Sequence, residues 1–566
     1  MKILGNNKKC SKIQYLKSDK EISKVFFITI FFIILFFNSF SQISNINSFG
    51  NRIKKNYLEY AIPVGSLDLD EDLRNLQLLN KFKSNNSFTI RPIYTNYEFS
   101  YDSILNNIDT GVYFTVFNRN PKKINFNLIP FTILQKHTTD HPYGWNDGAL
   151  KNAKGYQMLM NTGFNLNYRN LILNISPEFV YTENAKYQTP YFTPVQKNYL
   201  GNSFLFYNIK NLNIGVSNQN LWWGPGIYNS LIMSNNAPGF LHYNFSTNKP
   251  INTIFGTFEF QLIGGKLTRD LTQGLENKGM NKPDSLNGYF SYVKDYTQFN
   301  ERYINGIAIS YNPKFFKNLY LGINRIFMNY ARESIPDNFI ENYLPVFALF
   351  TVKDYEDKIN RDQILSINAR WLFPKNNAEI YIEGGFNDAF ANIRDFQLDL
   401  EHASAYIFGV KKIDYISEYK YLTYNIEITR LTQTPSYIHR NAGYWYQNSQ
   451  ILEGYTNDNQ IIGSGGGIGN NIQTFSFGYN NNDFRVNIKL QHIAQNPNRI
   501  YDSGNGNNGL GDIKWNDYLI GMNLRKRWQK FICKYSIDFI KSKNYNYIDN
   551  LTKFNIVNNL SIMYLW

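Results

Sequence analysis

The 566-residue sequence contains few of the residues that commonly carry catalytic or metal chemistry. It has two cysteines and six histidines. Cys10 lies in a predicted signal peptide, which leaves Cys533 alone and excludes an intramolecular disulfide or a cysteine metal site. His137 and His141 have the spacing of a helical metal site, but their segment leaves a predicted strand and reaches Pro142. We therefore expect neither a metal nor a cofactor.

Motifs of common enzymes are also missing. The glycine-rich stretch GSGGGIG at 463–469 has no following Lys-Ser/Thr and no βαβ context, so it does not predict a phosphate loop. No GxSxG nucleophile elbow is present. Carboxylates occur between 379 and 401, but a glycosidase pair needs a separation of roughly 5–9 Å, which sequence spacing cannot supply. We expect a protein that is not an enzyme; a barrel enzyme acting on glycans or lipids is the weakest alternative.

Long apolar runs are absent except for one near the N-terminus. Several lysines precede VFFITIFFIILFF at 25–37, which is too short to span a bilayer and has the length of a signal-peptide core. Ser39 and Ser41 then provide small residues at the −3 and −1 positions of a cleavage site. We predict that residues 1–41 are a signal peptide and that the mature chain begins at Gln42. A retained anchor is the alternative.

The residues that are abundant are aromatic. Phe, Trp and Tyr make up 17% of the chain, with 43 Tyr and 44 Phe. Many aromatic residues without further apolar runs are typical of a membrane barrel, and a large soluble all-β protein is the alternative. The formal net charge is +14, but no dense basic run occurs, so nucleic acid is not an expected partner.

From about residue 88 onward, apolar and polar residues alternate with a period of two. In 422–429 and 484–490, for example, every second residue is apolar and the residues between them are polar or charged. In a membrane barrel the apolar set faces lipid and the polar set faces a wet lumen, whereas a soluble sandwich would reverse these faces. The number, length and spacing of the strands favour the barrel.

The connections between these strands alternate in length. Short turns are predicted at 118–123, 168–170, 210–213, 312–318, 374–377, 480–483 and 527–530, and long segments at 134–157, 182–200, 220–250, 268–298, 328–362, 385–402, 431–471, 494–515 and 540–552. Short periplasmic turns and long outer loops are the rule for such barrels. We therefore predict an all-β fold, a transmembrane antiparallel β-barrel over 88–566, with eighteen to twenty strands because 88–99 and 251–267 are ambiguous.

The two ends of the mature chain have separate signals. Leucines and a phenylalanine repeat at helical spacing after an Asp-x-x-Glu start, which predicts a short amphipathic helix at about 69–82. It would make 42–87 a small helical region on the periplasmic side. The terminal NLSIMYLW places apolar residues on one face and ends on Trp566, a signal that barrel-insertion machinery recognises.

The stretch WWGPGIYNSLIMSNNAP at 222–238 contains too much Gly and Pro for a strand and too many apolar groups for a solvated loop. It resembles the signature of Wzi-type capsule assembly proteins of Gram-negative outer membranes, in their Bacteroidetes form. The resemblance continues through 145–157, 380–396, 401–409 and 453–471. It implies an eighteen-stranded outer-membrane β-barrel that acts as a surface lectin for capsular polysaccharide.

Most of these motifs fall in the predicted long loops, which the topology assigns to one rim. The candidate polysaccharide-binding residues are Trp145, Trp222, Trp223, Asp388, Arg394, Asp395, Glu401, His402 and Tyr455. Aromatic faces can stack on sugar rings, and the polar groups can bond hydroxyls. The alternative is that these loops fold into the lumen and satisfy one another.

We expect a cell-surface barrel that binds capsular or extracellular polysaccharide and assists its assembly or attachment. A porin or substrate-specific channel, in which the outer loops only constrict, is the alternative function. The expected partners are the polysaccharide, outer-membrane lipid and the insertion machinery, and we expect a monomer.

Overall fold

The structure is a computed structural model that describes residues 67–80, 85–93, 124–187, 194–269, 301–330, 362–387, 403–417, 420–432, 444–448, 451, 453–481, 484–497 and 513–566. All of them belong to the compact unit Tyr60–Trp566. The predicted signal peptide and the turn predicted at 118–123 lie outside the described residues.

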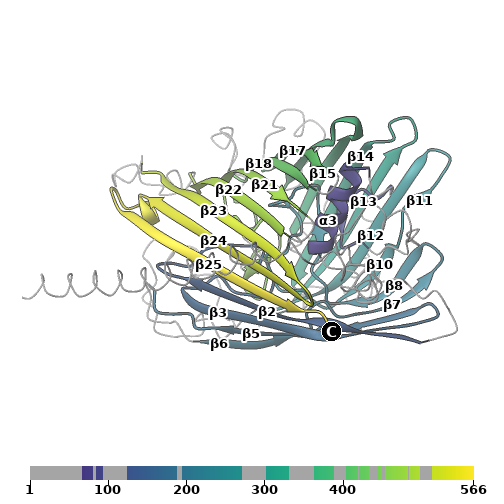
Figure 1. Cartoon of the computed structure of the whole chain (residues 1–566), viewed down its shortest axis with the longest axis horizontal. Coiled ribbons are helices and arrows are strands. Elements are labelled where there is room, and N and C mark those ends of the chain that lie inside the picture. Colours follow the sequence, from purple (N-terminus) through teal and green to yellow (C-terminus); the bar gives the residue numbers. More distant parts are fainter. Residues whose placement is uncertain are drawn as a thin grey trace, which may run out of the picture. The chain divides into compact units, whose positions relative to one another are not determined.

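The described residues form a closed antiparallel barrel (Figure 1). Its strands are β2 Asn125–Thr138, β3 Gly155–Tyr168, β4 Leu171–Ile175, β5 Glu178–Thr182, β6 Val195–Tyr199, β7 Phe204–Ile209, β8 Leu212–Ser217, β10 His242–Thr247, β11 Ile251–Asn252, β12 Gly256–Leu267, β13 Arg302–Pro313, β14 Leu319–Tyr330, β15 Asp362–Phe373, β16 Ala378–Phe386, β17 Ser404–Ser417, β18 Lys420–Arg430, β21 Asn471–Asn480, β22 Phe484–Gln495, β23 Trp515–Trp528, β24 Phe531–Lys543 and β25 Thr552–Tyr564. The segment pairs β4/β5, β6/β7 and β10/β11 are interrupted single strands, so the barrel has eighteen strands, and β25 closes it against β2. The predicted fold class is confirmed.

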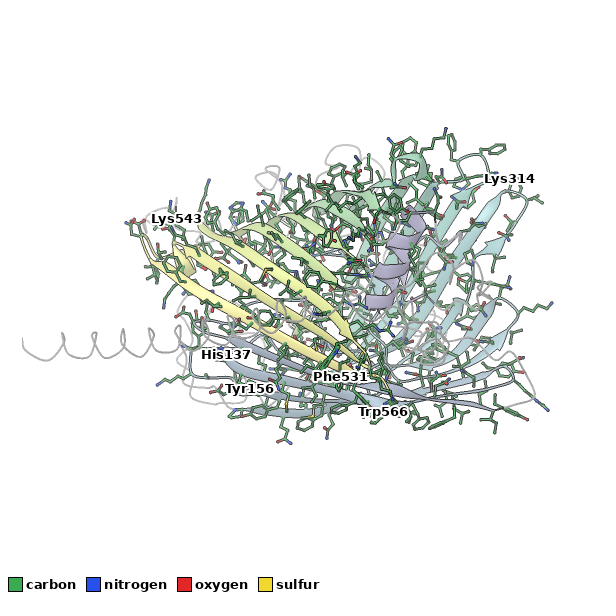
Figure 2. The ribbon with its side chains drawn as sticks, in the orientation of Figure 1. His137, Tyr156, Lys314, Phe531, Lys543 and Trp566 are labelled. Atoms are coloured by element: carbon green, nitrogen blue, oxygen red, sulfur yellow. The ribbon has the colours of Figure 1, made fainter. Side chains whose placement is uncertain are left out.

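The connections divide between the two ends of the barrel. Short turns join β3 to β4, β7 to β8, β11 to β12, β13 to β14, β15 to β16, β17 to β18, β21 to β22 and β23 to β24. We call this end the turn rim; it holds Phe531 and Trp566, whereas Lys543 lies at the opposite end, the loop rim, where the long connections are (Figure 2). The predicted turns inside the described ranges are confirmed.

The turn between β11 and β12 has a weak sequence signal, the single Gly256 at its end with a φ of 152°, which explains why 251–267 is ambiguous from the sequence. Its residues are Thr253, Ile254 and Phe255, without Gly, Pro or Asn. The Thr253 side chain supplies the turn chemistry instead: its hydroxyl donates to the Gly256 carbonyl (2.8 Å) and accepts from the Phe255 amide (3.3 Å). A local side-chain bond of this kind replaces the usual turn residues.

The strands have the predicted alternating faces. On β18, for example, Ile426 is 46% exposed on the outer face, while its neighbour Glu427 is 1% exposed on the inner face. Large apolar residues such as Phe408, Phe475 and Ile488 are likewise exposed on the outside. A belt of outward apolar side chains is what contact with lipid requires. Cys533, the remaining cysteine, is a half-buried wall residue of β24.

The inner face differs from the expected wet lumen, because much of it is apolar and covered. Ile263, Ile304, Ile326 and Ile407, from four different strands, point inward and are fully buried in one hydrophobic cluster. The cluster also contains residues from two long loops. Alternation predicts which residues point inward, but it does not predict that protein rather than water covers them.

The N-terminal region lies within the barrel in the described residues (Figure 1). Helix α3, Leu67–Leu78, confirms the helix predicted at about 69–82 and ends earlier, because Asn80 takes a left-handed φ of 55°. Leu78 and Leu79 pack against Tyr320, Leu372 and Ile413 near the turn rim. Among the described residues, no helix is long and apolar enough to cross a membrane.

The ambiguous segment 88–99 does not contribute a barrel strand in its described part. Strand β1, Ile90–Arg91, pairs instead with β9, Trp222–Trp223, in a separate two-stranded sheet. The N-terminal segment therefore contacts the long loop that follows β8.

Candidate functional site

The loop between β8 and β10, residues 218–241, fills part of the lumen, and we call it the plug loop. Trp223 is completely buried, and its indole nitrogen donates to the Gln261 carboxamide on β12 (2.8 Å). Leu231, Ile232 and Met233 are buried in the same cluster. The unusual composition of this stretch is thus explained by a loop that packs against the inner wall.

Two wall carboxylates hold the backbone of the plug loop. Glu427 accepts hydrogen bonds from three consecutive backbone amides, those of Ile227 (2.7 Å), Tyr228 (3.1 Å) and Asn229 (2.8 Å). Glu383 accepts from the Leu231 amide (3.3 Å). Three consecutive amides that donate to one buried carboxyl group fix the turn at 227–229.

A second network joins helix α3 to the wall. Arg74 and Arg370 both bond Glu379, with Nε to carboxylate distances of 2.8 and 2.7 Å, and all three side chains are buried. Arg74 also donates to the Pro225 carbonyl of the plug loop (2.7 Å), and Arg91 to the Gly226 carbonyl (2.7 Å). Buried charges are tolerated only when they are paired in this way.

One acid of the helix is less well satisfied. Asp70 is buried; one carboxyl oxygen accepts from the Ile93 amide (3.3 Å) and the other has no hydrogen-bond partner. Burial raises the pKa of Asp70 from 3.8 to about 8, which opposes the lowering effect of Arg91 and of the Ile93 amide.

A second long loop lies over the plug loop. Its described parts, 444–448, 451 and 453–470, are here called the cap loop. Tyr446 donates to the Leu231 carbonyl (2.9 Å), and Asn457 donates to the Pro238 carbonyl (3.0 Å). Asp458 reaches the far wall, where Lys197 of β6 lies 2.8 Å away. The cap loop thus connects distant strands across the barrel.

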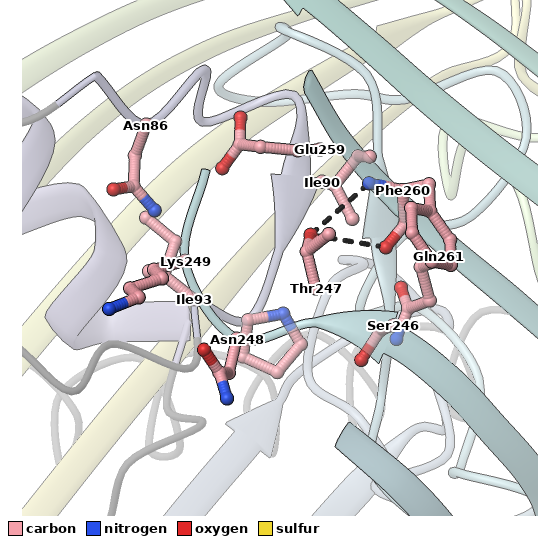
Figure 3. A pocket seen from close by; sticks show the side chains of 11 residues that line it. Asn86, Ile90, Ile93, Ser246, Thr247, Asn248, Lys249, Glu259, Phe260 and Gln261 are labelled. Atoms are coloured by element: carbon pink, nitrogen blue, oxygen red, sulfur yellow. Dashed lines mark hydrogen bonds between the residues drawn. The ribbon is translucent and has the colours of Figure 1, made fainter. Parts of the chain in front are cut away.

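A small cavity lies where the N-terminal segment meets the wall. It is lined by Asn86, Ile90, Pro92, Ile93, Ser246, Thr247, Asn248, Lys249, Glu259, Phe260 and Gln261 (Figure 3). Thr247 bonds the Phe260 backbone in both directions at its edge. With a volume of about 20 Å³ it has room for roughly one water and none for a sugar ring.

The structure places four of the nine predicted binding residues. Trp222, Trp223 and Tyr455 are at most 5% exposed, and Arg91 lies 4.6 Å from the Trp222 ring centroid. Trp145 is half-buried beside Tyr143. For these three buried residues the packing agrees with loops that fill the lumen. Asp388, Arg394, Asp395, Glu401 and His402 lie outside the described residues, so their predicted role stays a prediction.

Sequence reasoning missed the wall residues that hold the plug. The inward positions on the strands are taken by three acids, Glu379, Glu383 and Glu427. Acids at inward positions also fit a water-filled lumen, so the alternation alone does not indicate that they bind a loop. The only signal is the coincidence of acids on the inner face with one arginine, Arg74, in the predicted N-terminal helix. Among the described residues, no group of three or more His, Cys, Asp or Glu side chains is placed to hold a metal ion.

Eighteen closed antiparallel strands, an apolar outer belt and long loops gathered at one rim define an outer-membrane β-barrel. The model of the family "Capsule assembly protein Wzi" matches residues 129–545, and the chain belongs to that family. No curated protein matches the chain.

Solved structures agree with this fold. The chain is similar to Wzi of Escherichia coli, described as an outer-membrane protein involved in group 1 capsule assembly and a carbohydrate-binding β-barrel, with 12% identity and a TM-score of 0.58 over 89% of this chain and 100% of that one. The outer-membrane channel DcaP of Acinetobacter baumannii also matches, with 8% identity over 80% of this chain and 99% of that one; its TM-score of 0.27 is too low to support an argument.

Proposed function

We propose that this barrel binds capsular or extracellular polysaccharide at the cell surface and assists its assembly or attachment. The observation that supports the proposal is that the long loops, which share one rim, differ in where they lie. Some fill the lumen, as Trp223 and Leu231 do, while all nine long connections leave from the same rim. A barrel whose lumen is partly filled, with nine long connections at one rim, is suited to surface binding rather than to conduction.

The porin alternative is weakened by the same contacts. A porin needs a water-filled path, whereas here charged groups of the inner wall bond the plug loop and helix α3. The pairing of Arg74 with Glu379 and the three amides on Glu427 would have to break to open such a path. Low conductance remains an expectation to be measured.

The remaining expectations keep the status of proposals. The protein would act without turnover, as a monomer in contact with outer-membrane lipid, after delivery by the insertion machinery. The helical region 42–87 would lie toward the periplasmic side, and 88–566 would form the barrel unit, in which the described strand β1 pairs with the plug loop and not with the wall.

Deletion of the gene tests the proposed function. We expect polymer synthesis to continue while polymer is lost from the cell surface and accumulates in the medium. Complementation with the full chain should restore surface polymer. Unchanged surface polymer in the deletion strain would contradict the proposal, and loss of synthesis itself would indicate a different role.

A further inference from the structure

A second aromatic cluster lies at the loop rim and contains none of the nine predicted binding residues. Its members come from four separated segments of the chain: His141, Tyr187, Trp515, Tyr545 and Tyr547. We call it the Trp515 cluster. It lies where β23 and β25 begin and β24 ends, near the end marked by Lys543 in Figure 2.

The rings of this cluster are in direct contact. The centroid of Tyr545 is 4.6 Å from that of His141 and 4.8 Å from that of Trp515, and Trp515 lies 5.6 Å from Tyr547 at nearly a right angle. Tyr187 bonds Tyr545 through the two hydroxyls. Tyr545 is buried, whereas Trp515, Tyr547 and Tyr187 are half-buried and keep part of their surface accessible. The cluster therefore holds partly accessible rings in fixed positions.

Polar groups suited to hydroxyl recognition adjoin the rings. Asp140 lies between the His141 ring (3.1 Å) and the Lys553 ammonium (3.3 Å), with 28% and 37% of the Asp140 and Lys553 side chains exposed. The Trp515 indole nitrogen donates to Asp517 (2.8 Å), which fixes the ring orientation. His141 Nε2 is buried without a hydrogen-bond partner. A carboxylate and an ammonium that are partly exposed, and a buried imidazole, thus lie beside half-buried rings.

We propose that the Trp515 cluster is a sugar-binding subsite of the loop rim, in which Trp515 and Tyr547 stack on sugar rings and Asp140 and Lys553 bond their hydroxyls. Trp and Tyr side chains combine a large apolar face with a polar edge, which matches the apolar and hydroxyl-bearing parts of a pyranose. The proposal rests on the proposed function, since it names where on the rim the polymer binds. It assigns the binding to Trp515 of β23, Tyr547 of the β24–β25 loop, Asp140 of the β2–β3 loop and Lys553 of β25.

The test uses the purified full chain in detergent and the polysaccharide released from the surface of the strain that makes the protein. We expect Trp515→Ala and Tyr547→Ala each to weaken binding about tenfold, as removal of a stacking ring does elsewhere. Trp515→Phe should stay closer to wild type because it keeps a ring. Trp528→Ala, at the turn rim and 66% exposed, is the matched control and should bind like wild type.

Folding is checked by heat-modifiable electrophoretic mobility, and Lys553→Gln provides a surface variant with little risk of misfolding. For Lys553→Gln we expect a loss of about threefold. If the wild type binds and the folded Trp515→Ala, Tyr547→Ala and Lys553→Gln variants bind equally well, the subsite proposal is wrong while the proposed function stands. If the wild type itself does not bind, the proposed function fails.

Discussion

The outer and inner faces of the barrel wall are built from the same strands, but they meet different surroundings. Outward residues such as Ile426 and Phe475 form a uniform apolar belt, whereas the inner face divides into an apolar region around Trp223 and a charged region around Glu379. Lipid favours an apolar side chain at every outward position. The interior instead consists of individual contacts to particular loops, so the demands on an inward residue differ from one position to the next.

The largest expected effect comes from breaking the charged region. Glu379→Ala leaves Arg74 and Arg370 buried without their shared carboxylate, which should cost about 3–5 kcal/mol. We expect the temperature at which the barrel loses its heat-modifiable mobility to fall sharply. Ile380→Ala, one residue along and on the outer face, is the matched control and should change this temperature little. If both substitutions lower this temperature equally, the ion pairs of the inner face do not stabilise the barrel more than the apolar contacts of the outer face.

A charge placed on the outer face tests whether that face contacts lipid. Ile426→Lys places an ammonium in the lipid belt near the middle of β18 and should destabilise the barrel by about 2–4 kcal/mol. Ile426→Leu should be nearly neutral. The measurement is folding yield and urea stability in lipid vesicles. A Lys variant as stable as the Leu variant would mean that this face does not contact the bilayer core.

Asp70 gives the inner charged region a pH dependence. Because its pKa is raised from 3.8 to about 8, it contributes stability that is fully present below pH 3.8 and is lost as pH rises through about 8. Asp70→Asn stays neutral at every pH and should not show this loss, so we expect the two proteins to differ little at pH 5 and the variant to be the more stable one at pH 9, by on the order of 2 kcal/mol. Comparing the stability of the two proteins at pH 5 and pH 9 checks this. A difference that grows toward low pH would contradict the assigned sign.

The smallest effect on stability is expected at the loop rim. Arg394→Ala and Glu401→Ala, predicted from the sequence and outside the described residues, should change stability by less than about 0.5 kcal/mol. We nevertheless expect cells that carry these variants to retain less polymer. Flow cytometry with a polymer-specific stain measures this. Full retention in both folded variants would mean that neither residue contributes to binding.

Much of the wall could be predicted from the sequence because its signals are local. Alternation over 484–490 and the Asn-rich turn at 480–483 depend only on neighbouring residues. The turn at Thr253 could not be predicted from the sequence because a side-chain hydroxyl supplies hydrogen bonds that the usual turn residues would otherwise make. The pairing of Arg74 with Glu379, more than three hundred residues apart, depends on the closed barrel and has no local signal.

The positions of the candidate site residues inside the barrel likewise depend on contacts between distant segments, which have no local sequence signal. The resemblance located the plug loop and the cap loop correctly within the long connections. It could not tell that Trp223 and Tyr455 would be fully buried, because an aromatic residue in a loop is compatible with either a ligand or a wall. The Trp515 cluster escaped for a related reason: its rings come from four segments that meet only after the barrel closes.

Ion conductance in planar bilayers tests the central claim most directly, because a filled lumen and an open channel differ by orders of magnitude in current. We expect wild-type protein to conduct poorly. Glu427→Ala removes the acceptor of three plug-loop amides and should produce frequent, larger openings, while Ile426→Leu on the outer face should behave like wild type. A large, stable, open conductance from the wild-type protein would contradict the filled lumen and favour a porin.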